Sequence, residues 1–262
     1  MSMVDLGPVQ LHTRIDGPDS APWIILSNSL GSNLSMWDPQ IDLLTGTYRV
    51  LRYNTRGHGQ SSVPDGPYTL DMLVGDVVGL MDHLHIETAA WMGLSMGAMT
   101  GMGLALDHGA RFSRMVLADG RADAPEGFRT MWDQRTGMIR DGGTEAIADG
   151  TMESWLTEDF RQANPETVAK MRAMVVDTPD EGYIACALAL KELDYLRRLG
   201  NVQTPCLYIG GDRDMGAAPE TMQAMADATP GARYVSVPNA AHVANVNRPE
   251  AFNDAIRDFL GL

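Results

Sequence analysis

The chain has 262 residues, 44% of them hydrophobic, and a formal net charge of −14 at pH 7. This length and apolar content suit one α/β domain that carries an insertion. The negative charge argues against binding to nucleic acid or to anionic membranes, because both would be repelled.

Targeting and redox features are consistent with a cytoplasmic protein. The first residues, 1–5, hold no basic segment followed by an apolar one, so we expect no signal peptide, and no apolar run reaches the length of a membrane span. The two cysteines, Cys186 and Cys206, lack metal-ligand spacing and are expected to be reduced thiols.

Short apolar runs alternate with helical patterns along most of the chain. Residues 9–15 alternate in polarity and predict a solvent-facing antiparallel edge strand. The later runs are typical of buried parallel strands and lie at 23–27, 49–53, 87–92, 115–118, 206–209 and 234–237. The clearest helical patterns between them lie at 70–84, 96–106, 219–228 and 249–260.

One segment interrupts this alternation. From residue 123 to residue 199 the patterns are helical and no strand-like run occurs. We therefore expect residues 1–122 and 200–262 to form an α/β core with a mostly parallel sheet, and 123–199 to form a helical cap. In such sheets the ligand site lies beyond the carboxyl ends of the strands, so the cap would cover it.

The most informative motif is Gly93-Leu94-Ser95-Met96-Gly97, which matches G-x-S-x-G between a predicted strand and a predicted helix. In this pattern a strained turn exposes the serine hydroxyl at a helix N-terminus, and the glycines leave room for the backbone. A glycine-rich turn with an incidental serine is the alternative interpretation. The strand–turn–helix context favours Ser95 as a nucleophile.

A serine needs a base, and the base needs an orienting acid, in the chain order serine, acid, histidine. His242 follows the last predicted strand, where that base should lie, whereas His108 is too close to Ser95 in the chain. Asp212 and Asp214 both follow the preceding strand. We favour Asp214 because it lies farther into the loop.

An oxyanion site requires two backbone N–H groups. The residue after the nucleophile, Met96, supplies one, and we expect Leu30, in the loop after an early strand, to supply the other. His58 precedes Ser95 in the chain and is expected to shape the site rather than act as its base. No metal-ligand cluster and no nucleotide-binding glycine loop occurs, so we expect neither metal nor cofactor.

Several segments together give the chain a resemblance to the α/β-hydrolases, and within them to the 3-oxoadipate enol-lactonases. These segments are 26–31 (Leu-Ser-Asn-Ser-Leu-Gly), 56–62 (Arg-Gly-His-Gly-Gln-Ser-Ser), 93–97, 131–135 and 240–245. The resemblance implies an α/β-hydrolase fold, with its core at 1–122 and 200–262, and a cofactor-free lactone hydrolase of aromatic catabolism. It also points to Ser29 and Trp132 as substrate contacts. Residues 119–125 depart from the usual lactonase sequence.

Three functions are compatible with these residues. The first is hydrolysis of a small lactone, and the second is hydrolysis of another carboxylic ester or acyl compound by the same machinery. The third, a ligand-binding protein without catalysis, has no need for a serine, an acid and a histidine together. The partner is thus a small molecule, and homo-oligomerisation is left open.

The lactone implied by the resemblance carries a carboxylate, which the net charge of −14 would repel. A cation in the pocket must then attract it. Arg121, directly after a predicted strand, and Arg135, beside Trp132, are the candidates, because a guanidinium can bind a carboxylate through two hydrogen bonds. The alternative is that either arginine merely pairs with a neighbouring acid, such as Asp123 or Asp133.

Overall fold

The computed structural model describes all residues from Met1 to Leu262. Its centre is an eight-stranded sheet in the order β1-β2-β4-β3-β5-β6-β7-β8. The strands are β1 (Ser2–Asp5), β2 (Gln10–Asp16), β3 (Trp23–Ser27), β4 (Arg49–Tyr53), β5 (Ala89–Leu94), β6 (Phe112–Ala118), β7 (Cys206–Gly211) and β8 (Arg233–Val237). Only β1 and β2 pair antiparallel with their neighbours, which confirms the predicted mostly parallel sheet.

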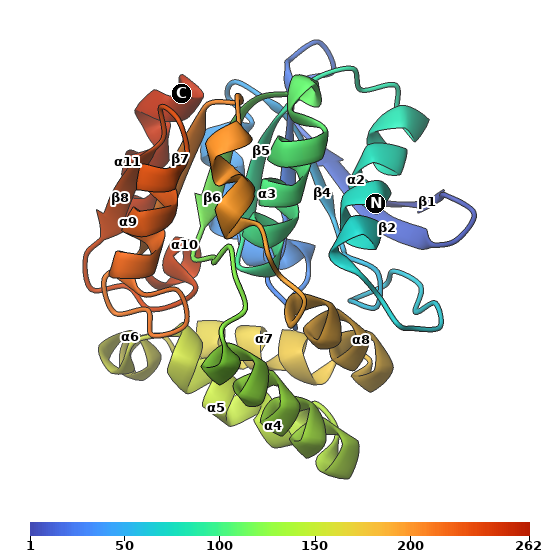
Figure 1. Ribbon diagram of the computed structural model, residues 1–262, viewed down its shortest axis with the longest axis vertical. Coiled ribbons are helices and arrows are strands. Elements are labelled where there is room, and N and C mark those ends of the chain that lie inside the picture. Colours follow the sequence, from blue (N-terminus) through green and yellow to red (C-terminus); the bar gives the residue numbers. More distant parts are fainter.

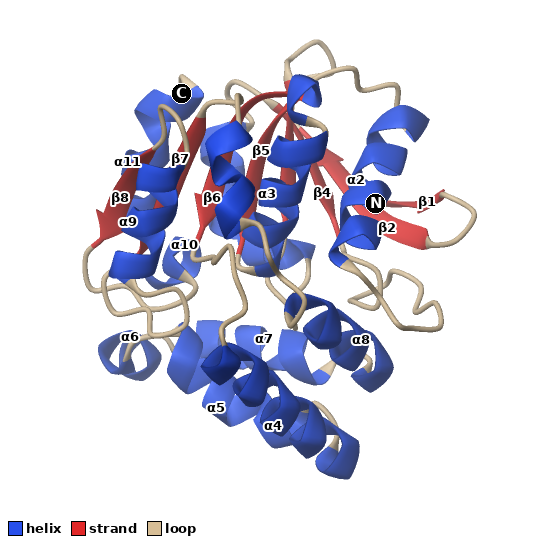
Figure 2. Cartoon of the chain, in the orientation of Figure 1, coloured by secondary structure: helices blue, strands red, loops and turns tan.

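Helices cover both faces of this sheet, as the alternation of strands and helices predicted (Figure 2). One layer contains α2 (Leu70–His83), α3 (Met96–Asp107) and α9 (Pro219–Ala228). The other contains α1 (Asp38–Leu44), α10 (Ala244–Asn247) and α11 (Pro249–Leu260). The central strands β3, β4, β5 and β7 are almost fully buried, whereas β8, at the edge of the sheet, has a single buried residue.

Five α-helices lie between β6 and β7 in the chain: α4 (Glu126–Gly142), α5 (Glu145–Trp155), α6 (Glu158–Ala163), α7 (Pro165–Val176) and α8 (Asp180–Leu190). In Figure 1 they form a separate layer below the sheet, at the carboxyl ends of the parallel strands. We call them the inserted helices. They lie on the side of the sheet where the ligand site was expected.

Close backbone contact joins the inserted helices to the core. A Cβ atom on Gly182, in α8, would lie 2.5 Å from the Cα of Gly57, and one on Gly57 would lie 2.6 Å from the Cα of Gly182. Gly57 also has a φ of +74°, which favours glycine. Only a pair of glycines allows the loop after β4 and the start of α8 to approach this closely.

Two of the sequence predictions were wrong in detail. The strand predicted at 9–15 corresponds to β2 but is not the edge of the sheet, because β1 pairs along its outer side. β1 has only four residues and one buried side chain. A strand this short gives no alternating pattern that the sequence could reveal. The strand predicted at 87–92 begins at Ala89 instead, since the exposed Glu87 and Thr88 still belong to the turn after α2.

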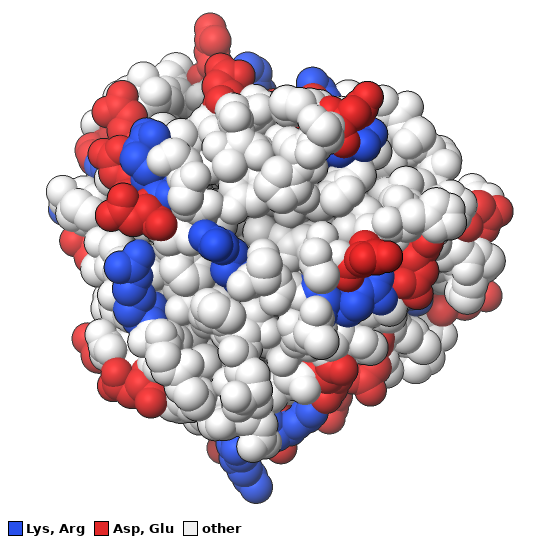
Figure 3. Space-filling view, turned by 90° about the horizontal axis from the view of Figure 1, so that it is seen from above, with Lys and Arg blue, Asp and Glu red and all other residues white.

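Charged groups of opposite sign share one face of the molecule. On the face opposite the inserted helices, acidic and basic side chains lie near one another around a largely uncharged centre (Figure 3). None of the helices combines the length and the apolar character that a membrane span requires. Both cysteines are buried thiols.

Candidate active site

Ser95 occupies a tight turn between β5 and α3. Its φ of 56° and ψ of −113° lie outside the regions that a non-glycine residue normally adopts. The two motif glycines have no room for a side chain: a Cβ on Gly93 would lie 2.2 Å from the carbonyl oxygen of Gly97, and one on Gly97 would lie 2.2 Å from that of Ser27. The elbow predicted from the motif is therefore present.

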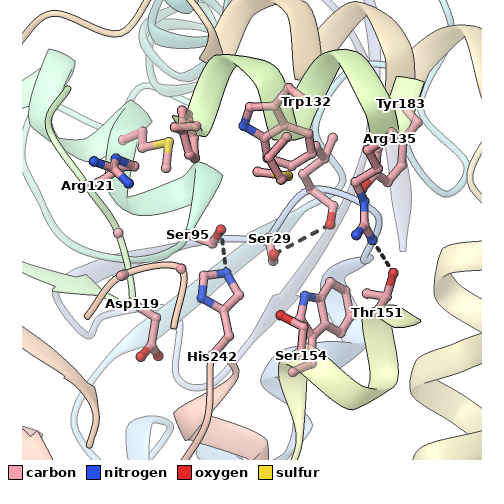
Figure 4. Close-up of a pocket in the computed structure, with 18 residues that line it drawn as sticks. Ser29, Ser95, Asp119, Arg121, Trp132, Arg135, Thr151, Ser154, Tyr183 and His242 are labelled. Atoms are coloured by element: carbon pink, nitrogen blue, oxygen red, sulfur yellow. Dashed lines mark hydrogen bonds between the residues drawn. The ribbon is translucent and has the colours of Figure 1, made fainter. Parts of the chain in front are cut away.

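Three residues from distant parts of the chain form one hydrogen-bonded series. The Nε2 atom of His242 lies 2.9 Å from Oγ of Ser95, and its Nδ1 atom lies 2.7 Å from Oδ2 of Asp214. Figure 4 shows the imidazole of His242 directed at Ser95 from the loop after β8. The other carboxylate oxygen of Asp214 accepts the N–H groups of Gly216 and Ala217. Asp214 is thus fixed by its own loop.

The groups around Asp214 and His242 determine which of the two side chains carries a proton. Burial alone would raise the pKa of Asp214, but His242 and the two backbone donors lower it below its ordinary value. Burial lowers the pKa of His242, yet the charge and hydrogen bond of Asp214 outweigh that effect and leave it raised. The pair therefore favours an ionised carboxylate beside an imidazole that readily accepts a proton.

The structure separates the two candidate acids. Asp214 is 3% exposed and bonds His242, whereas Asp212 is exposed. The backbone explains the difference: Asp212 donates its N–H to Val237 of β8 and still continues the sheet, and the chain turns toward the site only afterwards. The contact with His242 is made by the residue that the sequence favoured.

Two backbone N–H groups near Ser95 are unpaired. Those of Leu30 and Met96 make no hydrogen bond within the chain. The loop of Leu30 is held by His58, whose Nε2 accepts the N–H of Gly31 at 3.0 Å while its Nδ1 lies 3.1 Å from the carbonyl of Arg56. Burial lowers the pKa of His58 to about 4, so its imidazole is neutral and can accept this bond. His58 supports the loop, as expected.

A cavity of about 100 Å³ lies beside Ser95, between the core and the inserted helices. Its wall is mainly apolar and includes Leu30, Met99, Phe128, Met131, Trp132, Trp155, Tyr183 and Ala217. All four predicted substrate contacts, Ser29, Arg121, Trp132 and Arg135, also line it (Figure 4). No group of three or more His, Cys, Asp or Glu side chains is placed to hold a metal ion.

The two arginines of the cavity differ in their partners. Arg121 donates to the backbone and the carboxylate of Asp123, at 2.8 and 3.1 Å, and its guanidinium lies over the ring of Phe128. Arg135 bonds only the neutral hydroxyls of Tyr183 and Thr151. Its neighbour Asp133 pairs with Lys191 instead. Arg135 is therefore the cation of the cavity without a carboxylate partner.

Asp119 is a residue of the site that the sequence motifs did not reveal. This residue follows β6 directly, is completely buried and lies among the groups that line the cavity. An acidic residue at the carboxyl end of a parallel strand was the signal that could have revealed it.

Comparison with known proteins identifies relatives over almost the whole chain. A family model described as alpha/beta hydrolase fold matches residues 22–249. The chain is 37% identical to 3-oxoadipate enol-lactonase 2 of Acinetobacter baylyi, over 95% of this chain and 92% of that protein. It is 28% identical to a putative carbamate hydrolase, RutD, of Caulobacter segnis, over 90% of each chain. The crystal structure of the enol-lactonase of Burkholderia xenovorans LB400 superposes with a TM-score of 0.96 at 41% identity, with all of both chains covered.

Proposed function

We propose that this chain, which belongs to the α/β-hydrolase family, opens a small lactone bearing a carboxylate through an acyl-enzyme on Ser95. Its relatives make it a hydrolase of the lactone and ester type. The observation that carries this proposal is the hydrogen-bonded series Ser95–His242–Asp214 beside a cavity that contains an arginine without a carboxylate partner. Residues 123–199 would act as the cap over that cavity.

In the first half of the reaction, Oγ of Ser95 attacks the lactone carbonyl while Nε2 of His242 takes its proton. The N–H groups of Leu30 and Met96 bind the oxyanion that forms. Asp214 keeps His242 in the required orientation and stabilises its imidazolium form. The bond between the carbonyl carbon and the ring oxygen then breaks as His242 returns the proton to that oxygen.

In the second half, water attacks the acyl group on Ser95, and His242 again takes and returns the proton. Ring opening keeps the departing oxygen attached to the acyl chain, so both halves of the lactone leave as one molecule. For an enol lactone that oxygen belongs to an enol, which rearranges to a ketone. The product gains a second carboxylate.

The choice of substrate depends on Arg135. Its Nε and one terminal N–H are used by Tyr183 and Thr151, which leaves three of its five donors for a ligand. An apolar wall around it, with Trp132 and Trp155, would strengthen the attraction between this guanidinium and a carboxylate. The enol-lactonase names of the relatives point to the same substrate class.

A substrate panel tests the proposal. Purified protein is assayed with the carboxylate-bearing enol-lactone, its neutral methyl ester and p-nitrophenyl esters of small neutral acids. We expect the highest kcat/KM with the anionic lactone and only residual turnover by Ser95→Ala. A preference for the neutral esters would favour a general carboxylesterase, which is the second candidate because the same three residues would catalyse that reaction.

A further inference from the structure

Asp119 lies where the loops of the candidate active site meet. The carbonyl oxygen of its neighbour Ala118 accepts the N–H of Ser95 at 2.8 Å, and the N–H of Asp119 donates to Ile209 of β7 at 2.9 Å. Asp119 has a φ of +46°, which is uncommon outside glycine. This backbone conformation is held between the elbow and the neighbouring strand.

The side chain of Asp119 connects two further loops. Its Oδ1 atom accepts the N–H of Gly211 at 2.9 Å, shortly before Asp214, and its Oδ2 atom accepts the N–H of Ala244 at 3.3 Å, shortly after His242. The carboxylate is 0% exposed. Asp119 contributes to the wall of the cavity, but in Figure 4 its carboxylate points away from Ser95, where the substrate would react.

Two buried carboxylates therefore act on the charge of His242, although only Asp214 bonds its ring. Burial, and then the charge of Asp214, raise the pKa of Asp119 well above its ordinary value, while Asp119 in turn raises the pKa of His242. The other ionisable groups facing this cluster are Tyr234 on β8, a neutral phenol, and Arg135 on α4, whose charge opposes protonation of His242. Asp119 gains a counter-charge when His242 takes the proton of Ser95.

We propose that Asp119 is a positioning residue of the active site, a second buried carboxylate that holds the loops of Asp214 and His242 together and stabilises the imidazolium form of His242. This inference rests on the proposed function, because it requires His242 to act as the base for Ser95. It assigns no contact with the substrate to Asp119.

The test measures the rate at which a fluorophosphonate probe labels Ser95, as a function of pH, because labelling needs the base but not the natural substrate. Two variants remove the charge of Asp119: Asp119→Asn keeps the shape, and Asp119→Ser avoids placing an amide N–H against that of Ala244. Asp212→Asn is the matched control, since it removes an exposed carboxylate from the same loop as Asp214. Thermal unfolding identifies which variants fold, and either Asp119 variant suffices.

The negative charge of Asp119 near His242 favours the protonated imidazole. Removing that charge should therefore move the acid limb of the labelling profile to lower pH. We expect a shift of about one pH unit in both Asp119 variants, with the plateau rate lower by about tenfold. The control should retain the wild-type midpoint. A wild-type midpoint in folded Asp119 variants, whatever their stability, would overturn the inference. Equal labelling of Ser95→Ala and wild type would instead refute the proposed function.

Discussion

Replacing Arg135 by methionine tests whether this residue binds the carboxylate of the substrate. Methionine has a comparable reach along the wall of the cavity but no charge and no donor. Thr151 keeps its bond to the carbonyl of Ile147, and Tyr183 loses only the donor to its hydroxyl. We therefore expect the variant to fold.

The size of the effect follows from the bonds that are lost. A hydrogen bond to a charged group contributes about 1.5–3 kcal/mol. If the substrate carboxylate accepts from Arg135, kcat/KM for an anionic lactone should fall by about tenfold to 150-fold. The guanidinium also lowers the pKa of His242 slightly, so rates should be compared on the neutral plateau of the pH profile.

The assay compares the anionic lactone with its methyl ester at fixed ionic strength. The ester has the same reacting bond but no charge, so the ratio of the two kcat/KM values isolates the carboxylate contact. Arg121→Met is the matched control, because Arg121 lines the same cavity but is already paired with Asp123. We expect its ratio to stay near that of the wild type.

Three results would refute this reasoning. Equal losses on both substrates would mean that Arg135 supports the cavity without recognising charge. No loss on either would remove it from the site. A loss specific to the anionic lactone in Arg121→Met alone would assign the contact to the other arginine.

Further predictions concern the residues of the site and the stability of the fold. Ser95→Ala should lower kcat by about 10⁴ to 10⁶ with unchanged circular dichroism; a folded variant that keeps most activity would exclude Ser95 as nucleophile. Asp214→Asn should lower kcat by about 10³ to 10⁴ and Asp212→Asn far less, and steady-state kinetics of both variants would expose a reversed order. Turnover should survive dialysis against EDTA; full loss that an added metal restores would contradict the metal-free mechanism. Because the pKa of His58 is lowered to about 4 in the folded chain, the unfolded chain binds more protons below the ordinary value of 6.5. The free energy of unfolding should therefore fall by up to about 3 kcal/mol as the pH drops from about 6.5 to 4. Denaturant titrations over this pH range should show that His58→Gln lacks this pH-dependent loss.

The sequence predicted the parts of the site that local geometry controls. The G-x-S-x-G spacing defines a turn in which only glycine fits around Ser95, so the elbow is readable from five residues. The chain order of serine, acid and histidine then indicated His242 and left two aspartates, of which Asp214 was favoured because it lies farther into the loop; the structure contains its contact with His242. Whether these residues catalyse the reaction stays a prediction.

Choices that depend on tertiary contacts could not be read in the same way. Arg121 and Arg135 each have an aspartate nearby in the chain, yet only Arg121 pairs with its neighbour, because Lys191, at the end of α8, takes Asp133. Asp119 was missed because its importance arises from Gly211 and Ala244, which are distant in sequence. Such partners are set by packing and not by spacing.

The contact between Gly57 and Gly182 limits how the specificity of this enzyme can be redesigned. Exchanging the inserted helices for those of another hydrolase would import an unrelated residue opposite Gly57, and even alanine at position 182 would collide with the backbone there. A successful chimera must carry both glycines as a pair, or take the loop after β4 from the same donor. The junction that matters for such grafting thus lies inside α8, and not only at the two ends of the insertion.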